Sequence, residues 1–169
     1  MLGLPNGRVI LAPWSEQWHE GFLQEKEKIE EVGRPYIAEV HHIGSTSVKY
    51  LRAKPVLDIA VELAEFKDGV YVSSLLEQLG YDYKGTEILP DRHYLSKGSP
   101  RTHQIHMFER GNSYLMEQLK FRNCLRNNEK VRKEYELLKI KLAEAYASDK
   151  FKYTREKASF IQSILRNYG

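Results

Sequence analysis

The stretch that decides the fold comprises residues 41–61, which read HHIGSTSVKYLRAKPVLDIAV. An apolar segment ends at Ile43, Gly44 and three hydroxyl residues follow, and a second apolar segment begins at Pro55. Glycine lacks a Cβ, so it allows a tight turn and a close approach to a ligand. A short helix over 45–51 would then present free N–H groups that suit a phosphate or another anion. The stretch predicts a strand, a Gly-Ser turn, a short helix and a second strand.

Asp58 lies in the middle of the second apolar segment, Val56 to Val61. Aspartate is a poor strand former and is costly to bury without a partner. It is either a structural residue with a hydrogen bond or a metal- or phosphate-site residue facing the Gly-Ser turn. Lys54 adds a positive charge nearby, and the combination favours the second interpretation.

Two segments of this stretch, HIGSTSV at 42–48 and KPVLDI at 54–59, closely resemble the signature of the GrpB family. Similar segments occur at 13–22, 101–106 and 119–126, so the resemblance covers nearly the whole chain. That family is related to the nucleotidyltransferase superfold and also occurs fused behind dephospho-CoA kinase in some bacteria. The resemblance therefore implies a nucleotidyltransferase-like fold in a bacterial protein.

The length and composition fit one compact domain, residues 1–169, which can bury about two-thirds of its unfolded surface. The net charge is +3. Residues 1–84 carry 9 Lys or Arg against 13 Asp or Glu, a net charge of −4, whereas residues 85–169 carry 17 against 10, a net charge of +7. We interpret the positive half as solvated helix faces, with attraction of phosphate as the alternative.

The single cysteine, Cys124, excludes an intramolecular disulfide and fits a reducing compartment. We interpret it as a small core residue. The first residues lack the charged-then-apolar pattern of a signal peptide, and no apolar run approaches the roughly 18 residues of a membrane span. We expect a soluble, cytoplasmic protein with no membrane partner.

Apolar spacing and turn residues predict the remaining elements. Residues 9–12 would form an edge strand or an arm. Strands are expected at 36–43, 55–63, 81–84, 93–97 and 102–108. Helices are expected at 15–31, 68–79 and 112–126, in a longer segment with a buried stripe at 131, 135, 138 and 142, and from Thr154 onward. This order predicts an α/β (α+β) class with a mixed sheet, helices packed on it and a C-terminal helical segment.

The resemblance also implies a set of acids that this sequence contains only in part. The superfold usually places two acids at positions i and i+2 of the strand after the Gly-Ser turn, where they share a face, and a third on a later strand. Carboxylates are the usual ligands of hard divalent ions. Asp58 occupies the first position, but Ala60 occupies the second. Glu62 shares their face but lies about 13 Å from Asp58 along the strand, too far for one ion.

Histidines offer ligands in place of the missing acid. On the strand at 102–108, either His103 or His106 can face the site, because positions three apart point to opposite faces. With His42 and Asp58, His106 would complete a site for a divalent metal, namely Mg, Mn or Zn, and imidazole favours the transition metals. The alternative is that both His42 and His106 are hydrogen-bonded core residues.

We therefore expect a nucleotidyltransferase-like protein that binds a nucleotide or another phosphorylated small molecule. The expected ligand contacts are Gly44, Ser45, Thr46, Lys54 and Arg101. Asp58 and His106 would be the catalytic residues. The alternative is a non-catalytic module with a degenerate site, which holds a ligand or assists a protein partner, and Ala60 favours it. Nucleic acid is a disfavoured partner, because aromatic residues are not interleaved with the C-terminal positive charge.

Overall fold

The protein is built around a five-stranded sheet. The computed structural model describes residues 2–3 and 9–168, so positions 1, 4–8 and 169 of the predicted domain lie outside the described residues. The sheet order is β1-β2-β5-β4-β3. β2 and β5 are parallel, and the other neighbouring pairs are antiparallel. The strands are β1 (Ile37–Ile43), β2 (Leu57–Leu63), β3 (Asp82–Gly85), β4 (His93–Lys97) and β5 (His103–Glu109). The predicted mixed sheet is confirmed.

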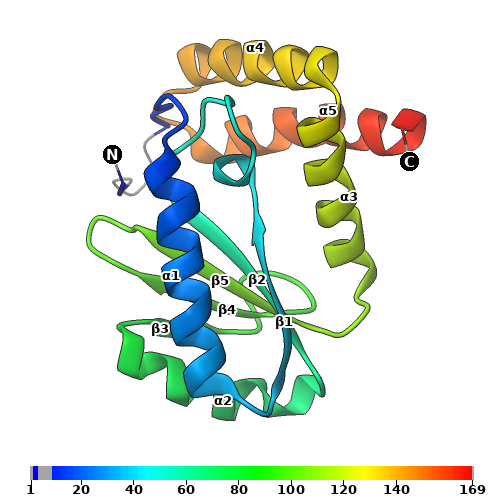
Figure 1. The fold of residues 1–169 in the computed structure, drawn as a ribbon. Helices are drawn as coiled ribbons and strands as arrows, with labels where there is room; N and C mark the ends of the chain where they lie inside the picture. The colour runs from blue at the N-terminus through cyan, green and yellow to red at the C-terminus, as the bar shows by residue number, and fades with distance from the viewer. Residues whose placement is uncertain (1, 4–8, 169) are drawn as a thin grey trace.

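Two helices cover one face of the sheet (Figure 1). α1 (Glu16–Gly33) begins after Ser15, whose hydroxyl accepts a hydrogen bond from a backbone N–H of the first turn. α2 (Gly69–Leu76) has a turn of 3-10 helix on each side, so the predicted helix at 68–79 is interrupted. These turns are η2 (Phe66–Asp68) and η3 (Glu77–Leu79). The apolar residues between these helices and the strands form the largest core cluster.

Three further helices follow β5: α3 (Ser113–Asn127), α4 (Glu129–Ala145) and α5 (Lys150–Tyr168). α3 packs on the second face of the sheet, where Leu115 contacts the cluster around Ala60. α5 begins four residues before the predicted cap, Thr154. None of the helices in the described ranges is long and apolar enough to cross a lipid bilayer.

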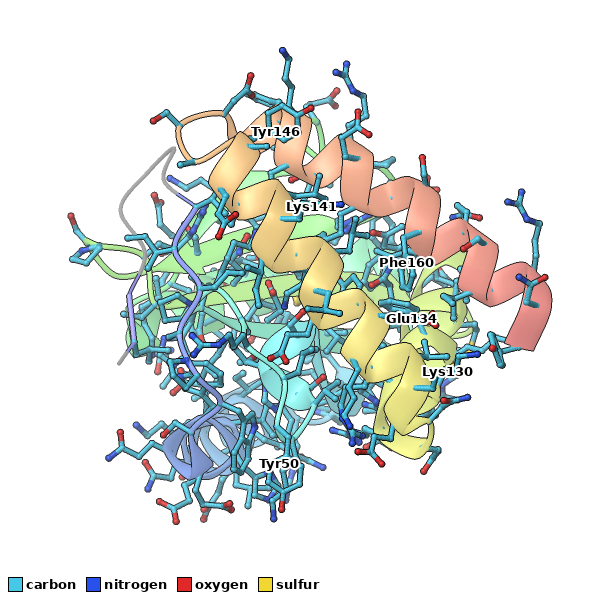
Figure 2. All side chains as sticks on the ribbon, turned by 90° about the horizontal axis from the view of Figure 1, so that it is seen from above. Tyr50, Lys130, Glu134, Lys141, Tyr146 and Phe160 are labelled. Atoms are coloured by element: carbon cyan, nitrogen blue, oxygen red, sulfur yellow. The ribbon has the colours of Figure 1, made fainter. Side chains whose placement is uncertain are left out.

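The C-terminal helices belong to the same packed body as the sheet. α4 and α5 lie side by side across one end of it, and Lys130 and Lys141 point outward from α4 (Figure 2). Their inner faces form a cluster with Val48 and Leu51, which lie between the Gly44 turn and β2. The helices therefore close over the stretch that carries the candidate site.

The segments around that stretch are shorter than the sequence predicts. The Gly44 turn continues into a three-residue 3-10 helix, η1 (Ser45–Ser47), and not into a helix reaching residue 51. Ala12 pairs with Ala53 through a single bridge, and the Val9 N–H donates to the Ala147 carbonyl at 3.1 Å. Residues 9–12 thus form an arm, which was one of the two predicted alternatives.

Candidate ligand-binding pocket

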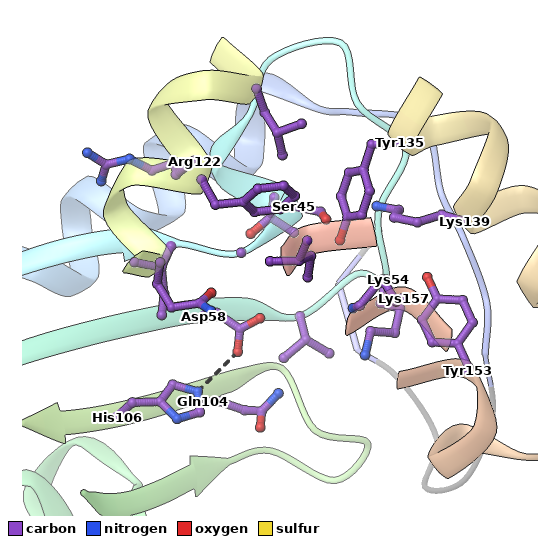
Figure 3. A pocket seen from close by; sticks show the side chains of 18 of the residues that line it. Ser45, Lys54, Asp58, Gln104, His106, Arg122, Tyr135, Lys139, Tyr153 and Lys157 are labelled. Carbon is purple, nitrogen blue, oxygen red and sulfur yellow. Dashed lines mark hydrogen bonds and ion pairs between the residues drawn. The ribbon is translucent and has the colours of Figure 1, made fainter. Parts of the chain in front are cut away.

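A pocket of about 190 Å³ lies between β2, the Gly44 turn and the helices α3, α4 and α5 (Figure 3). All five predicted ligand contacts line it: Gly44, Ser45, Thr46, Lys54 and Arg101. Asp58 and His106 line it too. The predicted residues therefore lie together around one cavity.

Gly44 forms a tight turn in the lining of this pocket. Its φ of +72° and ψ of −178° fall in a region that is essentially restricted to glycine. The turn directs the chain from β1 into η1 directly beside Asp58. η1 has only three residues, too few to form an anion site at a helix N-terminus.

Asp58 and His106 meet because of the register between β2 and β5. Asp58 pairs with Gln104, and Ala60 pairs with His106, so the side chains of Asp58 and His106 both face the helices α3–α5. The His106 Nε2 lies 3.4 Å from Asp58 Oδ1 (Figure 3). An Arg92 N–H points at the other ring nitrogen, Nδ1, at 3.5 Å. Since arginine can only donate, this arrangement favours the tautomer with the proton on Nε2, donated to Asp58.

Asp58 remains ionised at neutral pH. Burial raises the pKa of its carboxyl group, but the hydrogen bond from His106 and the charges of Lys54 and Lys157 outweigh that effect, so the pKa lies below its usual value. The side chain keeps 29% of its surface exposed, on the pocket. Asp58 thus presents a carboxylate that can accept a proton or a hydrogen bond from a ligand.

His42 does not join this pair. It pairs with Ile59 in the register between β1 and β2, so its ring points to the opposite face from Asp58. There it stacks on Phe22 with ring centroids 4.6 Å apart, and its Nε2 lies 2.9 Å from the Thr46 hydroxyl. Burial lowers the pKa of His42 to about 3, so the ring is neutral. The predicted convergence of His42 with Asp58 is not found.

The donor atoms around Asp58 do not fit a divalent metal held by the protein alone. Within the described ranges, no group of three or more His, Cys, Asp or Glu side chains is placed to hold a metal ion. Ala60 leaves the second acid position without a donor, as the sequence indicated. Glu62 is engaged elsewhere, with its carboxylate 2.8 Å from His41 Nε2. The expected metal ligands are thus reduced to Asp58 and His106.

Positive charge dominates the pocket. Asp58 is the single carboxylate among its described lining residues, whereas six lining residues are cationic: Lys54, Arg92, Arg101, Arg122, Lys139 and Lys157. Arg92 and Arg122 were not predicted as ligand contacts, and neither were the two helix residues Lys139 on α4 and Lys157 on α5. The interpretation of the C-terminal charge as solvated helix faces therefore fails for them, and only 1% of Lys139 is exposed.

A signal for both lysines is present in the sequence. Lys139 lies four residues after Tyr135 and three before Leu142, on the same buried stripe of α4. Lys157 likewise lies four residues after Tyr153, a buried residue one turn earlier on α5. A lysine within an apolar stripe must be buried or must line a cavity, and this one observation would have found both.

The lysines lie in an environment that disfavours their charge. Burial lowers the pKa of Lys54 to about 8, and the charges of Lys157 and Arg101 add to this effect. Burial, together with the charges of Lys157 and Lys54, holds the pKa of Lys139 well below its usual value. The negative charge of Asp58 raises the pKa of Lys54 and of Lys157, but it is a single charge and does not offset the lowering. The pocket therefore carries more positive charge than its own residues neutralise.

The fold is that of the nucleotidyltransferases. Structures of the Cid1 poly(U) polymerase superimpose with a TM-score of 0.54 at 12% sequence identity, over 78% of this chain and 42% of that one. At such low identity the similarity defines the class of fold alone. The protein thus has a nucleotidyltransferase-like fold with a cationic pocket.

The chain belongs to the GrpB family. The model of that family, described as "GrpB protein", matches residues 8–167. The crystal structure of the conserved protein GrpB from Enterococcus faecalis superimposes with a TM-score of 0.85 at 32% identity, over 94% of this chain and 99% of that one. Glutamate-rich protein GrpB of Alkalihalophilus pseudofirmus is 34% identical over 98% of both chains. UPF0157 protein YqkA of Bacillus subtilis is 34% identical over 96% of this chain, which spans 48% of that relative's length.

Proposed function

We propose that this protein binds a nucleotide or another phosphorylated small molecule in the pocket between β2 and the helices α3–α5. The observation that carries the proposal is the charge of the lining, with six Lys or Arg side chains against the carboxylate of Asp58. Phosphate oxygens accept charge-assisted hydrogen bonds from such groups, and these bonds are about twice as strong as neutral ones. A neutral or cationic ligand would leave the positive charge unmatched.

The related fold supports a nucleotide as the phosphorylated ligand. Cid1 has been solved in complex with a UTP analogue and with MgGTP. This chain spans 42% to 44% of those chains, so their polymerase activity is attributed to them alone. The feature carried over to this protein is the binding of a nucleotide, which we place in this cationic pocket.

A thermal-shift panel tests the proposal with nucleosides and their mono-, di- and triphosphates. Phosphorylated compounds should raise the melting temperature, and the free nucleosides should not. Lys54→Met should remove most of the shift. Lys49→Met is the matched control, because Lys49 lies over the Trp14 ring outside this pocket. No shift with any phosphorylated compound, or an equal loss in both variants, would contradict the proposal.

A transfer reaction is the second candidate, and the contact between His106 and Asp58 favours it. In such a reaction an acceptor hydroxyl attacks the α-phosphorus of a nucleoside triphosphate, pyrophosphate leaves and Asp58 takes the proton. Ala60, in contrast, favours a non-catalytic module that holds a ligand or assists a protein partner. Pyrophosphate release that Asp58→Asn abolishes without weakening nucleotide binding would support transfer. Binding without any turnover, with Mg, Mn or Zn added, would support the module.

A further inference from the structure

Two lysines in the pocket, Lys54 and Lys157, have no ion-pair partner among the described residues. Within the described part of the chain, Lys54 and Lys157 form neither a hydrogen bond nor an ion pair. Both ammonium groups instead lie over the ring of Tyr153, at 5.6 and 5.2 Å from its centroid. Figure 3 shows the two side chains next to each other on the side of the pocket opposite His106. Such a pair is costly to bury unless an anion accompanies it.

Two buried polar atoms of the pocket lining have no hydrogen-bond partner among the described residues. Tyr153 is fully buried, and its hydroxyl group has no partner; the Arg101 Nε is the second such atom. Buried polar groups are nearly always paired, so these two indicate a missing ligand. Lys139 is adjacent, with its ammonium group donating to the Arg52 carbonyl and lying over the Tyr135 ring.

These groups match a particular kind of anion. When Lys54, Lys139 and Lys157 are all protonated, their charges and that of Arg101 exceed the charge of Asp58 by three. A single phosphate monoester carries at most two negative charges at neutral pH, whereas a diphosphate or triphosphate chain carries three or four. The longer chain also supplies enough oxygens to pair with Lys54, Lys157 and Tyr153 together.

We propose that Lys54, Lys139, Lys157 and the Tyr153 hydroxyl bind the di- or triphosphate chain of the ligand directly, without a divalent metal. This inference rests on the proposed function and names the chemistry of its ligand. The lysines neutralise the charge of the phosphate chain, as metal ions do when carboxylates line a phosphate site. They also disfavour metal entry, because a divalent cation near Asp58 would be repelled by their charges.

Calorimetric titration with inorganic orthophosphate, pyrophosphate and tripolyphosphate tests this inference, each in EDTA and in Mg. Affinity should rise with the number of phosphates, and EDTA should not lower it. Lys157→Met should weaken tripolyphosphate binding about tenfold to a hundredfold, the effect of losing one charged hydrogen bond. Lys152→Met is the control, because Lys152 is exposed on the same helix and lies over Tyr146.

Thermal unfolding of the same variants separates binding from structure. Lys157→Met should fold with an unchanged or higher melting temperature, since it removes a half-buried charge that Lys54 repels. Tyr153→Phe should also fold and bind tripolyphosphate more weakly. A lower melting temperature with unchanged affinity would overturn the inference and make Lys157 structural.

The outcomes also separate this inference from the proposed function. If tripolyphosphate binds in Mg but not in EDTA, or no more tightly than orthophosphate, the inference is overturned while a phosphorylated ligand still stands. If neither the inorganic phosphates nor the nucleotides bind, both are overturned.

Discussion

A Cβ atom added to Gly44 would lie 2.8 Å from the Asp58 carboxylate oxygen Oδ2 and 3.2 Å from the Asp58 Cβ. The turn therefore packs directly against the Asp58 side chain and leaves no room for a Cβ atom. Gly44 also has a positive φ. The wall of the pocket depends on both residues, so a change in one displaces the other.

Gly44→Ala should lower the free energy of unfolding by about 1–3 kcal/mol, because alanine is strained in this backbone conformation. It should also weaken ligand binding by displacing Asp58. Urea unfolding measures the first effect and calorimetry the second. Gly85→Ala is a useful control, since Gly85 has a φ of +86° but nothing within 4 Å of an added Cβ. Equal effects on binding in the two variants would contradict the role of the Gly44–Asp58 contact.

Stability should fall as the pH drops from 6.5 toward 5. The unfolded chain protonates His42 near pH 6.5, but the folded protein resists protonation until about pH 3. The unfolded state therefore binds more protons in this window, and His42 should account for about 2 kcal/mol lost by pH 5. His42→Gln should reduce this pH dependence in urea unfolding. His103, with a pKa lowered to about 4, chiefly by burial, should account for part of the remainder.

Binding of tripolyphosphate should weaken as the pH rises from 7.5 to 9. The pKa of Lys54 is about 8, so its charge is lost over this range. The affinity should fall by up to about tenfold per pH unit for each lysine that deprotonates. The probe itself loses no negative charge. Calorimetry at three pH values measures the effect, and Lys54→Met should show a smaller slope. Affinity that stays constant with pH would show that Lys54 does not contact the anion.

A chain ending at residue 110 should not fold. Without α3, α4 and α5, the side chains of Val48 and Leu51, which are 1% and 0% exposed, would face solvent. Thermal unfolding monitored by circular dichroism measures the outcome. A cooperative transition in the shortened chain would show that the expectation of a single domain is wrong.

The sequence predicted the fold well, because the features that fix it are local. Gly44 marks the turn, the apolar segments on either side mark β1 and β2, and the 3–4 spacing after Val131 marks α4. The errors lie at helix ends, where packing decides: η1 stops at Ser47, since the chain leaves it to bury Val48 and Leu51.

The site was predicted only in part, because it depends on contacts between distant segments. The pairing of Asp58 with Gln104 decides that His106 faces the pocket, and the pairing of His42 with Ile59 decides that His42 does not. Neither register can be read from one strand. Lys139 and Lys157 were missed for a different reason: their positive charge was assigned to solvent although their helical positions indicated burial.

A crystal structure with a nucleoside triphosphate, grown in EDTA, tests most directly whether this pocket holds the phosphate chain of a small ligand. The predicted result is phosphate density between Lys54, Lys157 and the Tyr153 hydroxyl, on the helix side of Asp58. Density in the more open pocket lined by Trp14, His42 and Arg126 would contradict the account.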